Sequence, residues 1–263
     1  MSEPVNTARD GSTLIVTIDR PEALNALNRQ TTGELKQAFE GASRDRDIGA
    51  VVLTGAGRAF SSGADLKDVS ARFDAGDTRV GDDLRQNYAP LTRAIRGCPK
   101  PVIAALNGTA AGAGLSLALA CDLRIAAAGA QLIVAFVRVG LVPDAGSLFF
   151  LTRMLGLSKA TELAMTGEPI AVEEAQQLGL VAAVVPPEQV MPAALEQARR
   201  LAEGPRETIA LIKRGLERSL TLDLEQTLEL EAHLQTLAGK TEDAREAIRA
   251  FVEKRPPAFK GSP

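Results

Sequence analysis

Short apolar runs rich in β-branched residues alternate with segments of helical periodicity along most of the chain. The run at 12–18, Ser-Thr-Leu-Ile-Val-Thr-Ile, is bounded by Gly11 and Pro21, as is typical of a strand. Similar short runs predict further buried strands at residues 51–54, 101–106, 123–127, 132–134 and 181–185. Two of them, 51–54 and 101–106, end in glycine-containing turns.

Apolar positions between these runs recur at helical spacing. Thr31 and Glu34 have the spacing of a capping box and predict the start of a helix. Leu35, Phe39 and Ala42 fall on one face of that helix, so we expect this face to be buried against the core.

A polar stretch at 68–83 predicts a mobile surface segment. After it a helix is expected, whose apolar positions are Leu84, Tyr88, Leu91 and Ile95. The small residues of 112–121 predict another, tightly packed helix. The order of strands, turns and helices argues for an α/β fold.

The pattern changes after Gly204-Pro205, where the periodicity becomes helical and stays so almost to the end. Its apolar positions include Leu230, Leu234 and Leu237, spaced i, i+4, i+7. We therefore divide the chain into an α/β core, residues 1–203, and a helical region, residues 204–263. Apolar faces on such a region suggest that it docks on the core or on another subunit.

Composition narrows the class of protein. The chain has 263 residues, 45% of them hydrophobic, which is ordinary for a globular protein, and a net charge of −3, which argues against nucleic-acid binding. The start, Met1-Ser2-Glu3-Pro4, has no secretory pattern, and the apolar stretch 110–121 is too short to cross a bilayer. Cys98 and Cys121 make no disulfide framework, so we expect a cytoplasmic protein without a membrane partner.

Some catalytic groups are scarce. There is one histidine, His233, one tyrosine, Tyr88, and no tryptophan. A zinc site needs three or four ligands at suitable spacing, and a Ser-His-Asp triad would have to recruit His233 from the helical end of the chain. We therefore expect catalysis by backbone dipoles and carboxylates, with no metal and no cofactor.

Two loops of small residues follow buried strands. The first runs from Arg58 to Leu66 through Gly63, and the second runs from Asn107 into the helix at 112–121. Unpaired N–H groups at a helix start favour a developing negative charge. Either loop alone is a weak signal, since the spacing of the first favours a surface turn and the small residues of the second also fit close packing of its helix. Together, two such loops can present N–H groups as an oxyanion hole.

The resemblance of the chain to a known family rests on motifs in a fixed order. These are Arg20-Pro21 before Asn25-Ala26-Leu27, then Ala59-Phe60-Ser61-Ser62-Gly63-Ala64-Asp65-Leu66, Gly112-Ala113-Gly114 before Ala120-Cys121-Asp122, Gly140-Leu141-Val142-Pro143-Asp144, Gly167 before Ala171, and Ala175 before Gly179-Leu180-Val181. Over essentially its whole length the chain resembles the crotonase (enoyl-CoA hydratase/isomerase) superfamily.

The resemblance implies a ClpP/crotonase-like spiral of repeated ββα units, a helical C-terminal region, and assembly as a homo-trimer or hexamer. It implies an acyl-CoA substrate, whose thioester oxygen is held by the N–H groups of Ala64 and Ala113. The family usually has glycine where this chain has Ala113, but an alanine N–H donates equally well. The residues implied in substrate binding are Ala23, Leu24, Ser62, Gly63, Asp65, Leu66, Lys67, Gly112, Phe136, Val139 and Lys260.

Hydratases of this family use two glutamates, and the matching positions here hold Ser116 and Phe136. Neither is a carboxylate, so we do not expect simple hydration. The resemblance places Asp144 in the pocket as the remaining acid or base. Its position also fits a helix N-cap, which would lower its pKa, whereas an apolar pocket of Phe136, Val139 and Leu141 would raise it.

A single carboxylate that takes a proton from one carbon and returns it to another performs an isomerisation. The segment 136–146 resembles the 1,2-epoxyphenylacetyl-CoA isomerases of phenylacetate degradation, which can also shift double bonds in enoyl-CoA chains. We therefore expect an acyl-CoA isomerase. The alternatives are an enoyl-CoA hydratase-like enzyme, a dehalogenase-like enzyme, and a catalytically silent scaffold that binds acyl-CoA.

Overall fold

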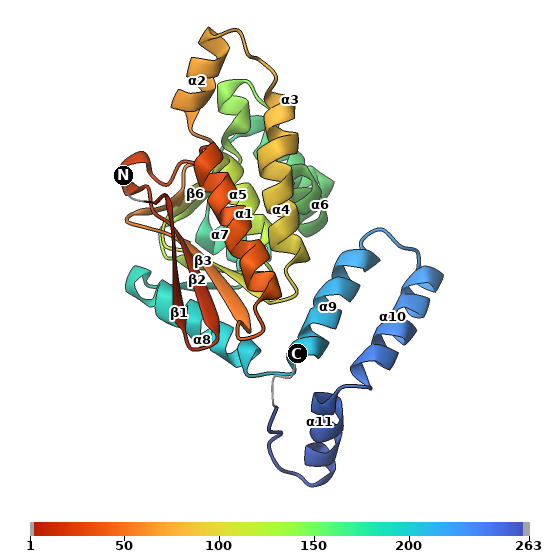
Figure 1. Cartoon of the computed structure of the whole chain (residues 1–263). Coiled ribbons are helices and arrows are strands. Elements are labelled where there is room, and N and C mark those ends of the chain that lie inside the picture. Colours follow the sequence, from red (N-terminus) through yellow and green to blue (C-terminus); the bar gives the residue numbers. More distant parts are fainter. Residues whose placement is uncertain (1–2, 260–263) are drawn as a thin grey trace.

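A six-stranded and a four-stranded β-sheet organise the chain (Figure 1), in a computed structural model that describes residues 3–259. The larger sheet has the order β1-β2-β3-β5-β7-β10, and the smaller has the order β4-β6-β8-β9. Two pairs, β1 with β2 and β8 with β9, are antiparallel, and the other pairs are parallel. The strands are β1 (Val5–Asp10), β2 (Thr13–Ile18), β3 (Ala50–Gly55), β4 (Ala59–Ser61), β5 (Val102–Leu106), β6 (Thr109–Ala111), β7 (Leu123–Ala127), β8 (Gln131–Ile133), β9 (Pro169–Ala171) and β10 (Ala183–Val185).

Successive pairs of strands step from the larger sheet to the smaller one. β3 is followed by β4, β5 by β6 and β7 by β8, and each pair leads into helical structure. This repetition confirms the expected α/β spiral of ββα units. The sequence pattern predicted β2, β3, β5, β7, β8 and β10, but it did not predict β1 or the three-residue strands β4, β6 and β9.

Helices cover the sheets (Figure 1). The helices of the core are α1 (Arg29–Arg44), α2 (Leu66–Asp74), α3 (Val80–Asp83), the π-helical η2 (Leu84–Tyr88), α4 (Ala89–Gly97), α5 (Gly112–Ala120), α6 (Ser147–Thr166), α7 (Val172–Gln177) and α8 (Val190–Ala202), with 3₁₀ turns η1 (Pro21–Ala23), η3 (Ala135–Val139) and η4 (Pro187–Gln189).

Helix α1 begins earlier than its sequence pattern predicted. Its N-cap is Asn28, whose side chain accepts a hydrogen bond from the Thr31 N–H at 2.8 Å, so the capping box at Thr31 and Glu34 was wrong. The predicted apolar face is confirmed, since Leu35, Phe39 and Ala42 are buried. The polar segment 68–83 is also more regular than expected, because α2 and α3 occupy most of it. Their side chains are mostly exposed, which explains the polar composition.

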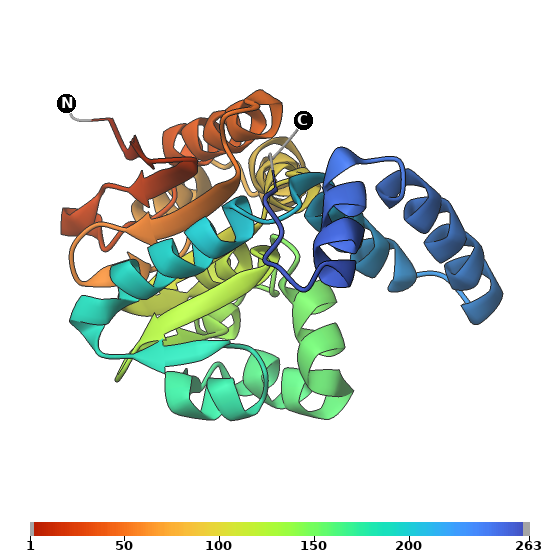
Figure 2. The same cartoon turned by 90° about the horizontal axis from the view of Figure 1, so that it is seen from below.

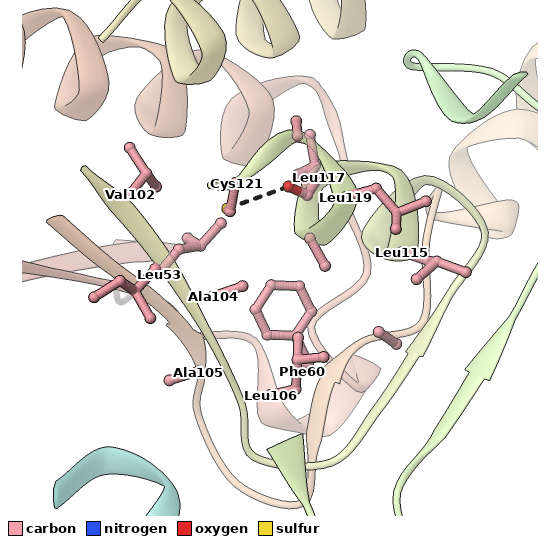
Figure 3. Close-up of a cluster of buried hydrophobic side chains, with 14 of the residues drawn as sticks. Leu53, Phe60, Val102, Ala104, Ala105, Leu106, Leu115, Leu117, Leu119 and Cys121 are labelled. Atoms are coloured by element: carbon pink, nitrogen blue, oxygen red, sulfur yellow. Dashed lines mark hydrogen bonds between the residues drawn. The ribbon is translucent and has the colours of Figure 1, made fainter. Parts of the chain in front are cut away.

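Helix α5 has one polar side chain, that of Ser116, and each of its residues is buried. Figure 3 shows Phe60 of β4 in one buried cluster with Leu115, Leu117 and Leu119 of α5 and with Leu53 and Leu106 of the larger sheet. A helix without a polar face has to lie inside the protein. The packing around α5 therefore fixes the position of its N-terminal end.

The C-terminal region consists of α9 (Arg206–Ser219), α10 (Leu224–Ala238) and α11 (Glu242–Val252), which lie beside the core (Figure 2). Lys213 joins α9 to the core, since its Nζ donates to Asp122 at 2.7 Å and to the Lys100 carbonyl at 3.1 Å. The helical character predicted for this region is confirmed, with breaks between the helices. Dividing the chain at residue 203 stays a prediction. Within residues 3–259, no helix combines the length and the apolar character that crossing a membrane requires.

Candidate active site

The loop that carries Ala64 is bound on one side to the segment before α1. Leu27 donates its N–H to the Gly63 carbonyl at 2.7 Å and accepts the Asp65 N–H at 3.0 Å. Asn25, which is buried, donates its side-chain amide to the Ala59 carbonyl at 2.7 Å and supports the start of the same loop. The two bonds to Leu27 use the Gly63 carbonyl and the Asp65 N–H, which flank Ala64. Among the described residues, the N–H of Ala64 itself donates no backbone hydrogen bond.

The loop that carries Ala113 lies directly beside the first. β4 and β6 pair in parallel, and α5 begins immediately after β6. Ala113 is the second residue of α5, where an N–H has no acceptor within its own helix. Two N–H groups thus lie on adjoining segments, with the dipole of a buried helix behind one of them.

Gly63 is the point of closest approach between these loops. Its φ is +97°, and a β-carbon added there would lie 2.9 Å from the Ala111 oxygen and 3.2 Å from the Ala113 nitrogen. Any other residue would be strained and would press against the N–H of Ala113. The two loops can therefore adjoin because residue 63 is glycine.

Asp144 lies in the segment between η3 and α6. The next two residues, Ala145 and Gly146, have φ values of +49° and +95°, and α6 begins at Ser147 with Gly146 as its N-cap. No side chain caps this helix, so the reading of Asp144 as an N-cap was wrong. The Asp144 carbonyl instead accepts the Ser147 N–H at 2.9 Å.

The carboxyl group of Asp144 is in an unfavourable place for a negative charge. Its Oδ1 is buried, and none of the groups in residues 3–259 forms a hydrogen bond with it. Burial, together with the negative charge of Asp83, raises the pKa of Asp144 from 3.8 to about 7. A carboxyl group with such a pKa can both accept and return a proton near neutral pH.

Asp83 and Tyr88 are two residues near this centre that the sequence analysis did not assign to the site. Asp83 of α3 binds Arg72 at 3.0 Å and Arg29 at 3.1 Å. Tyr88 of η2 is buried, and its hydroxyl donates to the Leu27 carbonyl at 3.2 Å. Burial, and then the charge of Asp144, raises the pKa of Tyr88, so its phenol stays protonated.

Tyr88 is the one tyrosine of the chain and ends a π-helical turn, a geometry frequent at functional sites. The hydroxyl of Tyr88 thus connects this turn to Leu27, whose backbone is hydrogen-bonded to the residues before and after Ala64. A cavity of about 390 Å³ adjoins these groups and is lined by Leu27, Asp65, Val69, Arg72 and Tyr88, among others.

The predicted substrate-binding residues lie in several environments, and their roles stay predictions. Ala23, Leu24 and Gly63 border the Ala64 loop, while Ser62, Leu66 and Lys67 are exposed beside it, and Gly112 begins α5. Asp65 forms an ion pair with Arg20 at 2.9 Å and also caps α2. Phe136 is buried in the core, whereas Val139 is 49% exposed in the single chain. Lys260 lies outside the described residues.

The charge state of Asp144 should make stability depend on pH. Because its pKa is higher in the folded than in the unfolded chain, the folded chain binds the proton more tightly between pH 4 and 7. The contribution of Asp144 to stability is therefore largest below about pH 4 and is lost as the pH rises through about 7. We expect Asp144→Asn to be more stable than the wild type at pH 8, by about 4 kcal/mol at most, and nearly equal to it at pH 4.

Urea unfolding followed at several pH values measures this difference. Asp82→Asn, next to Asp83 and half-exposed, is the matched control and should show no such trend. A difference between Asp144→Asn and the wild type that does not change with pH would contradict a buried, uncharged Asp144.

Comparison with known proteins defines the class. The model of the enoyl-CoA hydratase/isomerase family matches residues 8–262. The chain is 44% identical to the "probable enoyl-CoA hydratase" of Rhodobacter capsulatus, over 94% of each chain. It is 39% identical to the 1,2-epoxyphenylacetyl-CoA isomerase of Escherichia coli, over 94% of this chain and 95% of that one.

The fold agrees with solved structures of the same family. The crystal structure of an enoyl-CoA hydratase from Polaromonas sp. superimposes with a TM-score of 0.93 at 34% identity, over 97% of this chain and 99% of that one. The chain belongs to the enoyl-CoA hydratase/isomerase family, and it is an enzyme of the crotonase type.

Proposed function

We propose that the protein is an acyl-CoA isomerase that moves a proton with Asp144 while Ala64 and Ala113 hold the thioester oxygen. The observation that carries this proposal is the buried Asp144 carboxyl group, which has no hydrogen-bond partner at Oδ1 among the described residues and a pKa of about 7. No glutamate accompanies it at the positions where hydratases of the family have one, since Ser116 and Phe136 occupy them.

The proposed reaction needs no group beyond the chain and the thioester. The Asp144 carboxylate takes a proton from the carbon next to the thioester carbonyl of a 3-enoyl-CoA. The electrons of that C–H bond form a dienolate, whose charge on oxygen is met by the N–H groups of Ala64 and Ala113. Asp144 then returns the same proton to the fourth carbon, and the double bond shifts to the second. A donor aimed at such an oxygen contributes about 3–4 kcal/mol in known enzymes.

The relatives are named for different reactions on different acyl groups. The Escherichia coli relative is named a 1,2-epoxyphenylacetyl-CoA isomerase, which supports an aromatic epoxide thioester of phenylacetate catabolism as a second substrate. The Rhodobacter capsulatus relative is named a hydratase, so hydration of a 2-enoyl-CoA is the second candidate function. It requires a water molecule activated by Asp144 alone, because Ser116 cannot serve as a second carboxylate.

Incubating the purified protein with a 3-enoyl-CoA and, separately, with a 2-enoyl-CoA distinguishes these functions. We expect formation of the 2-enoyl isomer, with a rate that increases from pH 6 to pH 8 as Asp144 ionises. A 3-hydroxyacyl product from the 2-enoyl thioester would instead support the hydratase. Tight binding of both thioesters without conversion of either would indicate a scaffold protein.

We further propose a homo-trimer or hexamer in the cytoplasm, with no cofactor other than the coenzyme A of the substrate. Large apolar side chains remain exposed in the single chain on α6, α10 and α11, which supports assembly. They include Leu148, Leu157, Met165, Leu224, Leu228, Ile248 and Phe251.

A further inference from the structure

A pair of buried serine hydroxyls connects the two halves of the candidate active site. Ser116 lies on α5, one turn after Gly112, and Ser147 is the first residue of α6. Their side-chain oxygens are 2.6 Å apart, and both residues are almost completely buried. The two serines are 31 positions apart in the chain. Helix α5 carries Ala113, and helix α6 follows the segment that carries Asp144.

The two hydroxyls and one backbone carbonyl lie in a row, each within hydrogen-bond distance of the next. The Ser116 oxygen is 2.6 Å from the Ser147 oxygen, and either hydroxyl can be the donor of that bond. The Ser116 oxygen is also 3.2 Å from the Gly112 carbonyl, to which its hydroxyl can donate. The pair thus connects Ser147 of α6 with Ser116 and Gly112 of α5.

Both ends of this connection reach a group of the proposed reaction. Gly112 directly precedes Ala113, whose N–H is one of the two proposed donors. At the other end, the Ser147 N–H donates to the carbonyl of Asp144 at 2.9 Å. Hydrogen bonds joined through Ser147 itself therefore connect the start of α5 with the backbone of the proposed acid and base.

The segment around Asp144 needs such support. Ala145 has a φ of +49°, a conformation that costs free energy for a residue with a side chain, and surrounding contacts have to hold it. Thr92 of α4 supplies one contact, since its hydroxyl donates to the Ala145 carbonyl at 3.0 Å. The Ser147 hydroxyl supplies another contact, and this contact holds the segment against Ser116 of α5.

We propose that Ser116 and Ser147 form a positioning pair, which sets the separation between the Ala113 N–H and the Asp144 carboxyl group. The pair itself touches no reacting atom. This inference rests on the proposed function, because it assigns those two groups to one reaction. It predicts that loss of either hydroxyl slows the proton transfer without removing substrate affinity, as misplaced catalytic groups do.

Ser116→Ala, Ser147→Ala and the double variant test the pair. We expect each single variant to reduce kcat for the 3-enoyl-CoA by about tenfold or more, with a KM within about twofold of the wild type. The double variant should be no slower than the slower single variant, since both hydroxyls act through one connection. The pH midpoint of kcat should fall as well, because a loosened segment admits water to Asp144 and lowers its pKa.

Ser43→Ala is the matched control. The Ser43 hydroxyl makes the same kind of helical bond, to the Phe39 carbonyl at 2.8 Å, but on α1. It should change neither kcat nor the pH midpoint. The positioning pair would be disproved by single variants that match Ser43→Ala, or by losses that multiply in the double variant. A loss of kcat that merely follows a loss of folded protein in thermal unfolding would also disprove it.

A second readout works without turnover and so separates this inference from the proposed function. An inactive wild type would contradict the isomerase assignment alone. The pair is then tested by the carbonyl stretching frequency of a bound saturated acyl-CoA and by the titration of ¹³C-labelled Asp144. We expect both to change in the two serine variants and to stay unchanged in Ser43→Ala. Unchanged values in all variants would overturn the positioning role.

Discussion

Replacing Asp144 with asparagine should reduce conversion of a 3-enoyl-CoA by about 10²–10⁴-fold, the usual contribution of a positioned acid or base. Asparagine has nearly the same shape, so the strained turn after residue 144 can form as before. It cannot accept a proton, and that loss falls on kcat. KM should stay within a few-fold of the wild type, because the N–H groups of Ala64 and Ala113 remain.

Steady-state kinetics on the 3-enoyl-CoA and calorimetric titration with a saturated acyl-CoA measure the two effects separately. Asp82→Asn, which removes a half-exposed carboxylate at α3, should behave as the wild type. Near-normal turnover by Asp144→Asn would show that another group moves the proton.

Gly63→Ala should be nearly as damaging, although it removes no functional group. The added methyl would lie 3.2 Å from the Ala113 nitrogen and 2.9 Å from the Ala111 oxygen, so the loops have to move apart. An oxyanion donor lost in this way costs about 10²–10³-fold in kcat. The left-handed φ of +97° adds a cost in stability, of about 1 kcal/mol.

Gly129→Ala separates these two effects. Gly129 also has a positive φ, of +79°, but no atom lies within 4 Å of an added β-carbon. This control should lose stability and keep its turnover. If Gly63→Ala and Gly129→Ala lost activity to the same extent, the contact with Ala113 would not be the cause.

Much of the core could be predicted because its strands are long enough to show a pattern. The buried runs at β2, β3, β5 and β7 stand out by their β-branched and apolar residues. The strands β4, β6 and β9 have three residues each, which is too few to set them apart from loops in the sequence. The start of helix α1 was predicted too late because Thr31 and Glu34 have the spacing of a capping box, whereas Asn28, three residues before Thr31, forms the actual cap.

Some residues of the candidate site could likewise be predicted from the sequence, and others could not. Motifs brought attention to Ala64, Ala113 and Asp144, which are close in the chain to conspicuous glycines. Asp83, Tyr88 and Ser147 lie outside these motifs, and their relation to the site comes from folding. Tyr88 reaches Leu27 across 61 positions, and Ser147 reaches Ser116 across 31. Contacts over such separations leave no trace in local patterns.

The absence of a solvent face on α5 has a consequence for altering the enzyme. Every side chain of this helix packs inside the protein, so a substitution anywhere along it shifts the Ala113 N–H as well as the core. The outer helix α2 carries mostly exposed side chains and adjoins the cavity beside Tyr88, whereas α3 carries Asp83, whose charge acts on Asp144. New acyl selectivity should therefore be sought by randomising α2, while α3 and α5 are left untouched.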